Sequence, residues 1–406
     1  MAFREQQYLD RNFDYICRML DLLGQNVLEP NYRPNWRTAY ITSIVVIVMS
    51  ELVYLLWTER SDLFAFLQVL PTLLFSCIGV QNVLVCALRS EKVLALRTKL
   101  TEILKIMAET EGNGPILCKG LQLSRLLQKC LMVLYALAAV AGIIVPLIIW
   151  AAWGKKILLF TPFVPKADPS TAVGFVETLV FQGYILLGAG TMYTAHECMF
   201  IAFIMPYAAY VNAFCNEIKE LNSMLVALPE SDDSTIQNQL HRIEKLHQLL
   251  IEYVSMLQDL YNSYMLSKVA LIYLGVISAI LVILTFADPM SCIFLALLFE
   301  KLTKSCLMGT IITVKVGLFP WILISNLNIN VNCVLFQNEQ IMDHIYDINW
   351  FRLSADQAKQ VGFMLHMSQN PTSITIGNLA PLNVESYMSL VKSIYSYVMV
   401  LITFLE

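Results

Sequence analysis

The chain has 406 residues, of which 57% are hydrophobic and 14% are charged, and its net charge is −4. Soluble globular domains carry about 25% charged residues, so the composition excludes a soluble enzyme as the default expectation. A net negative charge without a basic stretch also argues against nucleic acid as a partner.

Apolar runs long enough to cross a bilayer occur seven times, since about 20 helical residues span its ~30 Å hydrocarbon core. The runs lie at 39–57, 63–88, 130–153, 178–208, 266–286, 308–335 and 386–405. The apolar stretch Met290–Phe299 is too short to span, so we interpret it as an extension of the fifth run or an interfacial piece. We therefore expect an all-α membrane protein with seven transmembrane helices.

The basic residues predict how these helices are oriented, because Lys and Arg are retained on the cytoplasmic side. With the N-terminus inside, 20 of the 27 basic residues fall in the cytoplasmic segments 1–38, 89–129, 209–268 and 336–392. The first twenty residues lack the apolar core of a cleaved signal peptide, so insertion would rely on the first span. We expect a cytoplasmic N-terminus and an extracellular C-terminus.

The segment Thr235–Lys268 shows the spacing of an amphipathic helix that starts at Ser234 or Thr235 and continues into the fifth span. The segment 337–346 extends the sixth span inward in the same way. Such extensions predict a packed cytoplasmic anchor domain suited to subunit contact. The alternative, a helix lying on the inner membrane surface, is disfavoured because the polar face mixes Glu244, Glu252 and Asp259 with few cations. The apolar stripe consists of Ile236, Leu240, Ile243, Leu246, Leu250, Tyr253, Leu257, Leu260 and Tyr264.

This pattern divides the chain into four parts. Residues 1–38 form a cytoplasmic helical segment, and residues 39–335 hold the first six spans, with 209–265 as their cytoplasmic extension. Residues 336–385 form the anchor segment, and residues 386–406 form the seventh helix.

The last helix, SYMSLVKSIYSYVMVLITFLE from Ser386 to Glu406, is just long enough to span. It carries hydroxyls at Ser393, Ser396 and Tyr397 and becomes apolar only after them. A helix with hydroxyls on one side and small or β-branched residues on the other can line a pore where several copies meet. The alternative is an anchor helix whose hydroxyls bond to neighbouring helices.

The stretch Cys333–Leu405 resembles the C-terminal region of insect odorant receptors. The matching features are Cys333, Ile345-Tyr346 followed by Trp350, HMSQNP at 366–371, Gly377, LAPL at 379–382 and the closing Ser396-Tyr397 with its apolar tail. Thr403 stands where the family most often has Gln, which puts the polarity of the pore at that level in question. The first three hundred residues match the family in layout more than in motif.

The resemblance implies a subunit of a ligand-gated, non-selective cation channel in the plasma membrane of sensory neurons. Family members of this type form heterotetramers with a shared odorant receptor co-receptor, and the last helix of each subunit lines a common pore. Carried onto this chain, the pore residues are Ser396, Val400 at the hydrophobic gate and Thr403 at the polar ring just outside it. A gate of Val side chains blocks ions because hydrated cations do not shed water against apolar walls.

The resemblance also implies that each subunit binds a small volatile odorant among the outer halves of its own helices, in an apolar and aromatic pocket with few polar groups. Ile143, Pro146 and Trp150 share one helical face, although a Trp at this depth is also typical of the interfacial belt. Ordinary packing is the better explanation for Leu73, Leu74 and Ile143 taken singly. The expected ligand residues are Leu73, Leu74, Cys77, Ile143, Pro146, Trp150, Phe181, Tyr184, Gly188 and Phe319, with Lys315 beside the last.

Charged side chains inside spans cost roughly 2.5–3.5 kcal/mol at the bilayer centre, so they should face protein or water. We expect Glu51 to pack inward and His196-Glu197 to form a buried polar pair in the fourth span. Cys292 and Cys306 both lie near the predicted outer loop, where a disulfide is open to them.

Motifs for catalysis or metal binding are missing from the sequence. The ten cysteines include no C-x-x-C pair, the five histidines lack metal-ligand spacing, and neither a nucleophile elbow nor a phosphate loop occurs. We expect no enzymatic activity, no metal and no cofactor.

Other membrane protein classes compete with the channel interpretation. An insect gustatory receptor shares fold and tail but works without the co-receptor. A G-protein-coupled receptor is disfavoured by the loop charges and by the lack of Asp-Arg-Tyr after the third span, and a transporter by the lack of two related halves.

Overall fold

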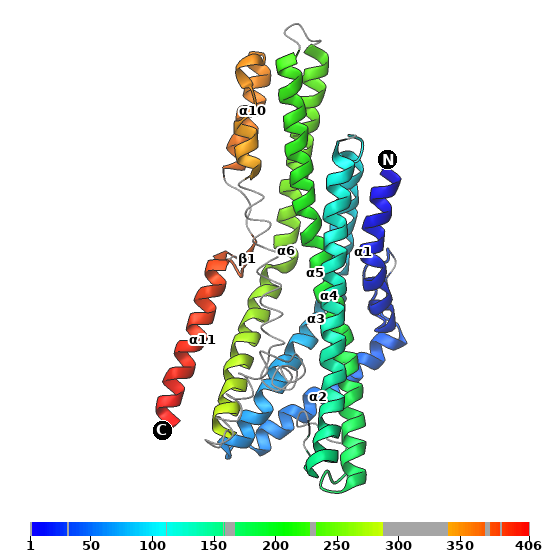
Figure 1. The fold of residues 1–406 in the computed structure, drawn as a ribbon, viewed down its shortest axis with the longest axis vertical. Helices are drawn as coiled ribbons and strands as arrows, with labels where there is room; N and C mark the ends of the chain where they lie inside the picture. Colours follow the sequence, from blue (N-terminus) through cyan, green and yellow to red (C-terminus); the bar gives the residue numbers. More distant parts are fainter. Residues whose placement is uncertain are drawn as a thin grey trace.

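A computed structural model describes residues 2–405 except 31, 111, 157, 159–166, 228–232, 287–339, 370–373 and 382–383. Figure 1 shows long helices running along the vertical axis of the molecule. The elements are α1 (Ala2–Leu22), α2 (Trp36–Thr58), α3 (Leu63–Met107), α4 (Asn113–Trp153), α5 (Ala172–Ala227), α6 (Asp233–Phe286), η1 (Trp350–Arg352), α10 (Ala355–Ser368), β1 (Thr375–Ile376), β2 (Ala380–Pro381) and α11 (Val384–Leu405).

The predicted spans are largely recovered in these helices. Within the described part of the chain, five segments are long and apolar enough to cross a membrane: Trp36–Thr58, Ala65–Cys86, Asn113–Trp153, Ala172–Ala227 and Asp233–Ser278. They contain or overlap the first five predicted runs, and α11 coincides with the seventh. The sixth run, 308–335, lies outside the described residues.

Several helices are much longer than a bilayer requires, because they continue into a second, more polar region. We call this second part the extension region; it comprises α1, residues 89–107 of α3, 113–129 of α4, 209–227 of α5 and 233–265 of α6. The remainder of α2–α6 is called the span region. In Figure 1 the extension region is the upper part and the span region the lower part.

The predicted amphipathic helix is confirmed as the first half of α6, which begins at Asp233, one residue before the expected start. All nine residues of its apolar stripe are buried, from Ile236 to Tyr264. The stripe packs into a core that also contains Phe13 of α1 and Phe203 of α5, whose ring centroids lie 5.6 Å apart. The extensions therefore fold as one packed unit with α1.

Helix α5 stands at the centre of the fold and α2 at its edge. The apolar window of α5 is 89% buried inside the protein, whereas that of α2 is only 11% buried. Large apolar side chains of α2 such as Ile47, Val53 and Tyr54 are exposed, as expected for a surface that faces lipid. Asn35 caps the start of α2, because its side chain accepts from the backbone N–H groups of Arg37 and Thr38.

A buried carboxylate ties four helices together in the extension region. Glu217 of α5 accepts hydrogen bonds from Thr110 Oγ1 at 2.6 Å, Asn113 Nδ2 at 2.8 Å and Gln239 Nε2 at 2.9 Å. Arg242 of α6 forms an ion pair with the same carboxylate at 3.4 Å, and its guanidinium donates to the Ile106 carbonyl of α3 at 2.6 Å. A buried charge is stable where such partners surround it, so this site fixes the relative positions of α3, α4, α5 and α6.

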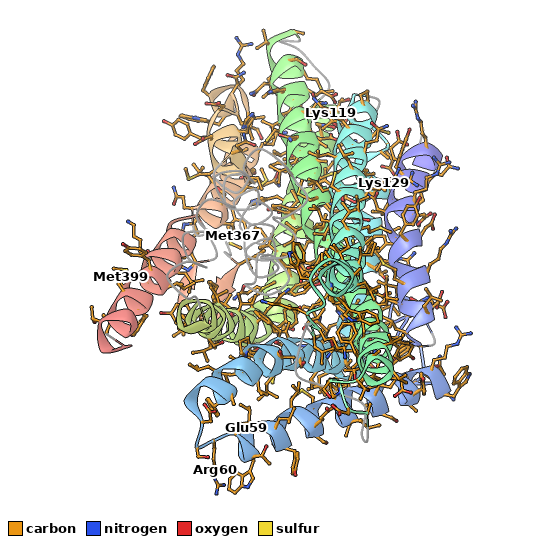
Figure 2. The ribbon with its side chains drawn as sticks, turned by 60° about the horizontal axis from the view of Figure 1, so that its bottom comes forward. Glu59, Arg60, Lys119, Lys129, Met367 and Met399 are labelled. Atoms are coloured by element: carbon orange, nitrogen blue, oxygen red, sulfur yellow. The ribbon has the colours of Figure 1, made fainter. Side chains whose placement is uncertain are left out.

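The C-terminal elements lie along one side of α6. Figure 1 shows α10 beside the extension region and α11 beside the span region, with β1 between them. Strands β1 and β2 form a two-stranded antiparallel hairpin, in which Thr375 pairs with Pro381 and Ile376 with Ala380. Figure 2 shows α11, marked by Met399, standing at the edge of the helix bundle, and the turn from α2 to α3 marked by Glu59 and Arg60.

Candidate functional site

The face of α4 that was predicted to bind ligand packs against α5. Pro146 is buried, Ile143 and Trp150 are half-buried, and the Trp150 ring meets Phe175 edge-on at 5.3 Å between centroids. Ile143 Cδ1 lies 3.4 Å from the position that a Cβ on Gly183 would occupy, so the glycine allows this close approach. Trp150 thus has an aromatic neighbour within the fold, next to the predicted α5 residues.

The α5 residues of the candidate pocket differ in their surroundings. Phe181 and Gly188 are half-buried, and Tyr184 is exposed within the single chain. Among the described residues, no atom outside the local helix backbone lies within 4 Å of the position of a Cβ on Gly188 or on Gly190. The described residues therefore leave this stretch of α5 uncrowded at these two glycines.

The α3 residues of the predicted set are half-buried, and one of them has clear packing partners. Leu73 packs against a small apolar cluster made by Val48 and Leu52 of α2 with Val69 of α3. Leu74 and Cys77 are half-buried on the same helix. Leu73 thus packs against its neighbours, which agrees with the expectation of ordinary packing for this residue taken singly. Phe319, Lys315, Cys292 and Cys306 lie outside the described residues.

A tyrosine pair at this site was missed by the sequence analysis. The Tyr184 hydroxyl donates a hydrogen bond to the Tyr40 hydroxyl of α2 at 3.1 Å, across 144 residues of sequence. Tyr40 lies near the start of the first span, and no local pattern links it to the fourth span. The pair adds polar groups next to an otherwise apolar region, as ligand pockets commonly have.

The buried acid of the fourth span has a partner other than the expected one. Glu197 forms an ion pair with Lys268 of α6, and both side chains are only 2% exposed. His196 instead lies with Nε2 3.6 Å from Cys86 Sγ of α3. Both residues are buried as expected, but they do not bond to each other, because adjacent helical residues point about 100° apart and meet different neighbours. Glu51 is half-buried in α2, and its inward orientation stays a prediction.

Lys268 belongs to a polar layer between α3, α5 and α6. Its ammonium lies 5.1 Å from the centroid of the Tyr264 ring, and Tyr264 donates to Asn82 Oδ1 of α3 at 2.7 Å. Arg89 of α3 adds a hydrogen bond from its guanidinium to Ser263 Oγ at 2.7 Å. The layer fixes the middle of α6 against two neighbouring helices at the boundary between the span and extension regions.

The predicted pore residues share one exposed face of α11. Ser396, Val400 and Thr403 follow one another at four and three residues and are all exposed in the single chain. A neighbouring face is packed: Ile394 is buried, the Tyr397 ring meets Tyr273 of α6 edge-on at 6.3 Å between centroids, and the Tyr273 hydroxyl lies 3.2 Å from Ser393 Oγ. One side of α11 thus contacts its own subunit, while the candidate pore face is left uncovered by the residues that the structure describes. The hydroxyls on that face donate along the helix, Ser396 to Lys392 O and Thr403 to Val400 O.

A groove lies at the far end of the extension region. It is polar and basic, and it is separated from the predicted ligand residues by the length of the bundle. Its lining consists of Ile106, Glu109, Met224, Thr235, Asn238, Gln239, His241, Arg242 and Lys245. Arg242 is already engaged by Glu109 and Glu217. The character of this groove does not suit a small apolar ligand.

Comparisons with known proteins agree on one family. The sequence profile described as 7tm Odorant receptor matches residues 62–395. A Drosophila melanogaster protein that carries the name odorant receptor 83c is 22% identical over an alignment of 402 residues that covers 95% of each chain.

Solved structures show the same fold. The olfactory receptor OR5 of the insect Machilis hrabei in complex with eugenol matches with a TM-score of 0.77 and 13% identity, over 99% of both chains. The structure of OR5 described without a ligand matches with a TM-score of 0.72 and 13% identity, over 97% of this chain and 98% of the other. The fold is thus a seven-helix membrane fold, as expected from the sequence.

Proposed function

Since the chain belongs to the 7tm odorant receptor family, we propose that it is the odorant-binding subunit of a ligand-gated, non-selective cation channel. It is an odorant receptor subunit by family, and the channel activity follows from that membership. We assign the pore to the exposed face of α11 and the odorant site to the region between α3, α4 and α5.

The observation that carries the pore assignment is the division of α11 into two faces. Tyr397 and Ser393 hold the helix to α6, while Ser396, Val400 and Thr403 have no covering element among the described residues. At 3.6 residues per turn, the centres of the two faces are about 70° apart around the helix, and the faces adjoin at Val400. Four such helices around one axis would present Val400 as an apolar ring and Thr403 as a polar one. An apolar ring resists the passage of hydrated cations until it widens.

Thiol modification tests this assignment. Val400→Cys and Thr403→Cys place a thiol in the proposed pore, and Tyr395→Cys is the matched control on an exposed face outside it. A water-soluble methanethiosulfonate reagent should reduce odorant-evoked current through the first two variants and leave the third unchanged. An equal effect of the reagent on the currents of all three variants would show that this face of α11 does not line the pore.

The proposed odorant site is small, apolar and aromatic. Trp150 and Phe175 provide ring surfaces, the Tyr184–Tyr40 pair provides hydroxyls, and no described side chain crowds Gly188 of α5. The related Machilis hrabei receptor was solved with eugenol, a compound of this class, which makes eugenol a sensible first probe. Aromatic contact gives affinity, and the hydroxyls set the orientation of a polar substituent.

Two tryptophans on α4 provide a matched test of this site. Trp150 contacts Phe175, whereas Trp153 is 67% exposed. Trp150→Ala should raise the half-maximal odorant concentration by about tenfold, the equivalent of losing ~1.4 kcal/mol of binding. Trp153→Ala should leave it unchanged. If Trp150→Ala leaves the half-maximal concentration of every active odorant unchanged, the odorant site does not include Trp150.

The proposed partner is an odorant receptor co-receptor in a heterotetramer, assembled through the cytoplasmic side. An exposed aromatic surface supports this proposal: Trp350 is 57%, Phe351 68% and Phe363 57% exposed in the single chain. Exposed apolar patches of this kind mark subunit contacts. Trp350→Ala with Phe351→Ala should reduce co-purification with the co-receptor, whereas Trp36→Ala, 74% exposed on α2, should not. Undiminished co-purification of the double variant would contradict this choice of interface.

The proposed location is the plasma membrane of sensory neurons, with the N-terminus in the cytoplasm. Epitopes placed at the two ends should then differ in access to antibody on intact cells, with only the C-terminal one labelled. Labelling of the N-terminal epitope would contradict this orientation.

A further inference from the structure

A compact set of side-chain hydrogen bonds joins the β1–β2 hairpin to α6. Gln258 Oε1 accepts from the Thr375 backbone N–H at 2.8 Å, and Asn262 Oδ1 accepts from the Asn378 backbone N–H at 3.1 Å. Asn262 Nδ2 donates to Asn378 Oδ1 at 3.0 Å, and the Asn262 carbonyl accepts from the Gly377 N–H at 3.3 Å. We call these four side chains, Gln258, Asn262, Thr375 and Asn378, the amide clamp.

The turn of the hairpin is shaped to fit this clamp. Gly377 and Asn378 both have positive φ, 61° and 59°, which is the backbone of a tight hairpin turn that Gly and Asn tolerate best. A Cβ on Gly377 would lie 2.5 Å from Leu266 Cδ2, so only glycine lets the turn approach α6 this closely. The turn residues and the α6 amides therefore form one complementary contact.

The stretch of α6 that carries the clamp is itself fixed on its other side. Tyr264, two residues after Asn262, is about 200° further around the helix. It bonds Asn82 of α3, and Lys268, one turn on, pairs with Glu197 of α5. Tyr273, further along, contacts Ser393 and Tyr397 of α11. Residues 258–273 of α6 thus connect the helix bundle, the hairpin and the pore helix.

We propose that Gln258 and Asn262 are positioning residues for the pore helix, acting through Thr375 and Asn378. The hairpin ends at Pro381 and α11 begins at Val384, so a hairpin held on α6 sets where α11 starts. The clamp and the Tyr273 contact then fix α11 at two levels of the same helix. The position of α11 is set by α6 through these amides, and movement of α6 is transmitted to the pore helix. This inference builds on the proposed pore role of α11.

The first test measures the position of α11 without any current. Tyr273→Cys with Ser393→Cys places two thiols across the α6–α11 contact, and a short bifunctional methanethiosulfonate reagent joins them in the intact receptor. Asn262→Ala in this background should slow the cross-linking by about fivefold, the population change expected from losing one net hydrogen bond. Asn238→Ala is the control, because it removes an exposed amide from the same helix. An unchanged rate in Asn262→Ala would overturn the proposal.

The second test measures function per receptor at the surface. Asn378→Gly keeps the positive φ that the turn needs and removes only the amide contacts, so folding should be preserved. It should lower the maximal odorant-evoked current per surface receptor by about fivefold and leave the half-maximal odorant concentration near the wild-type value. A wild-type maximal current in Asn378→Gly would contradict the proposal. If the wild-type receptor gives no odorant-evoked current, while Asn262→Ala still slows the cross-linking, the channel role is refuted and the role of the clamp in positioning α11 is supported.

Discussion

Lys268→Met removes one partner of an ion pair that is closed to solvent. Both side chains of the Glu197–Lys268 pair are 2% exposed, so the variant leaves Glu197 as an uncompensated buried charge. Breaking a buried pair from one side costs about 3–5 kcal/mol. Exchange of both partners for uncharged groups of similar size is often close to neutral, so Glu197→Gln combined with Lys268→Met should recover most of the loss.

A surface pair supplies the matched control. Lys92 of α3 bonds Asp259 of α6 at 2.6 Å, but these side chains are 52% and 65% exposed. Solvent screening limits such a pair to about 1 kcal/mol or less, so Lys92→Met should change stability little. Both lysines bridge α6 to a neighbouring helix, and the two pairs differ mainly in burial.

The assay is the fraction of detergent-solubilised receptor that remains monodisperse after heating. Domains of 150–250 residues shift by about 2–4 °C per kcal/mol and longer chains by less, so at about 1–2 °C per kcal/mol Lys268→Met should lower the midpoint by roughly 3–10 °C. The double variant should lie within a few degrees of wild type. A midpoint for Lys268→Met equal to that of Lys92→Met would refute the argument that this pair is buried and structurally required.

Three further outcomes follow from single sites. His247 is buried against the ring of Phe214, and burial lowers its pKa to about 4 from the usual 6.5. Between these two pH values the unfolded chain binds one more proton than the folded chain, so the free energy of unfolding is highest above pH 6.5. It falls by about 3 kcal/mol at most as the pH drops toward 4. In His247→Phe the melting temperature should therefore change less across that pH range. Gly362→Ala, in α10 with open space around it, should stabilise by about 1 kcal/mol, whereas Gly377→Ala should destabilise; equal melting temperatures for the two would contradict the geometry. Val400→Ala should raise the odorant-independent current by widening the proposed gate, and a leak equal to wild type would argue against a gate there.

The sequence predicted features that depend on local periodicity. The spacing of apolar residues from Ile236 to Tyr264 identified the buried stripe of α6, and the start at Asp233 came within one residue. Apolar length likewise identified the described spans, because a bilayer fixes the length that a helix must have. Features encoded by a single helix can thus be read without knowledge of its neighbours.

The contacts that define the candidate site could not be predicted in this way. Glu197 and Lys268 are 71 residues apart, Tyr40 and Tyr184 are 144 apart, and Gln258 and Thr375 are 117 apart. Lys268 counted among the cytoplasmic basic residues, although the fold buries it against an acid. Such pairs depend on how helices rotate and pack against one another, which one chain's pattern of residues does not encode.

The most direct test of the central claim is whole-cell current under G-protein block, in cells carrying this chain alone and together with an odorant receptor co-receptor. An odorant panel that includes eugenol should evoke cation current only when both are present, and the block should not reduce it. Current that disappears under the block would contradict a channel and indicate a metabotropic receptor. Current from this chain alone would contradict the dependence on a co-receptor.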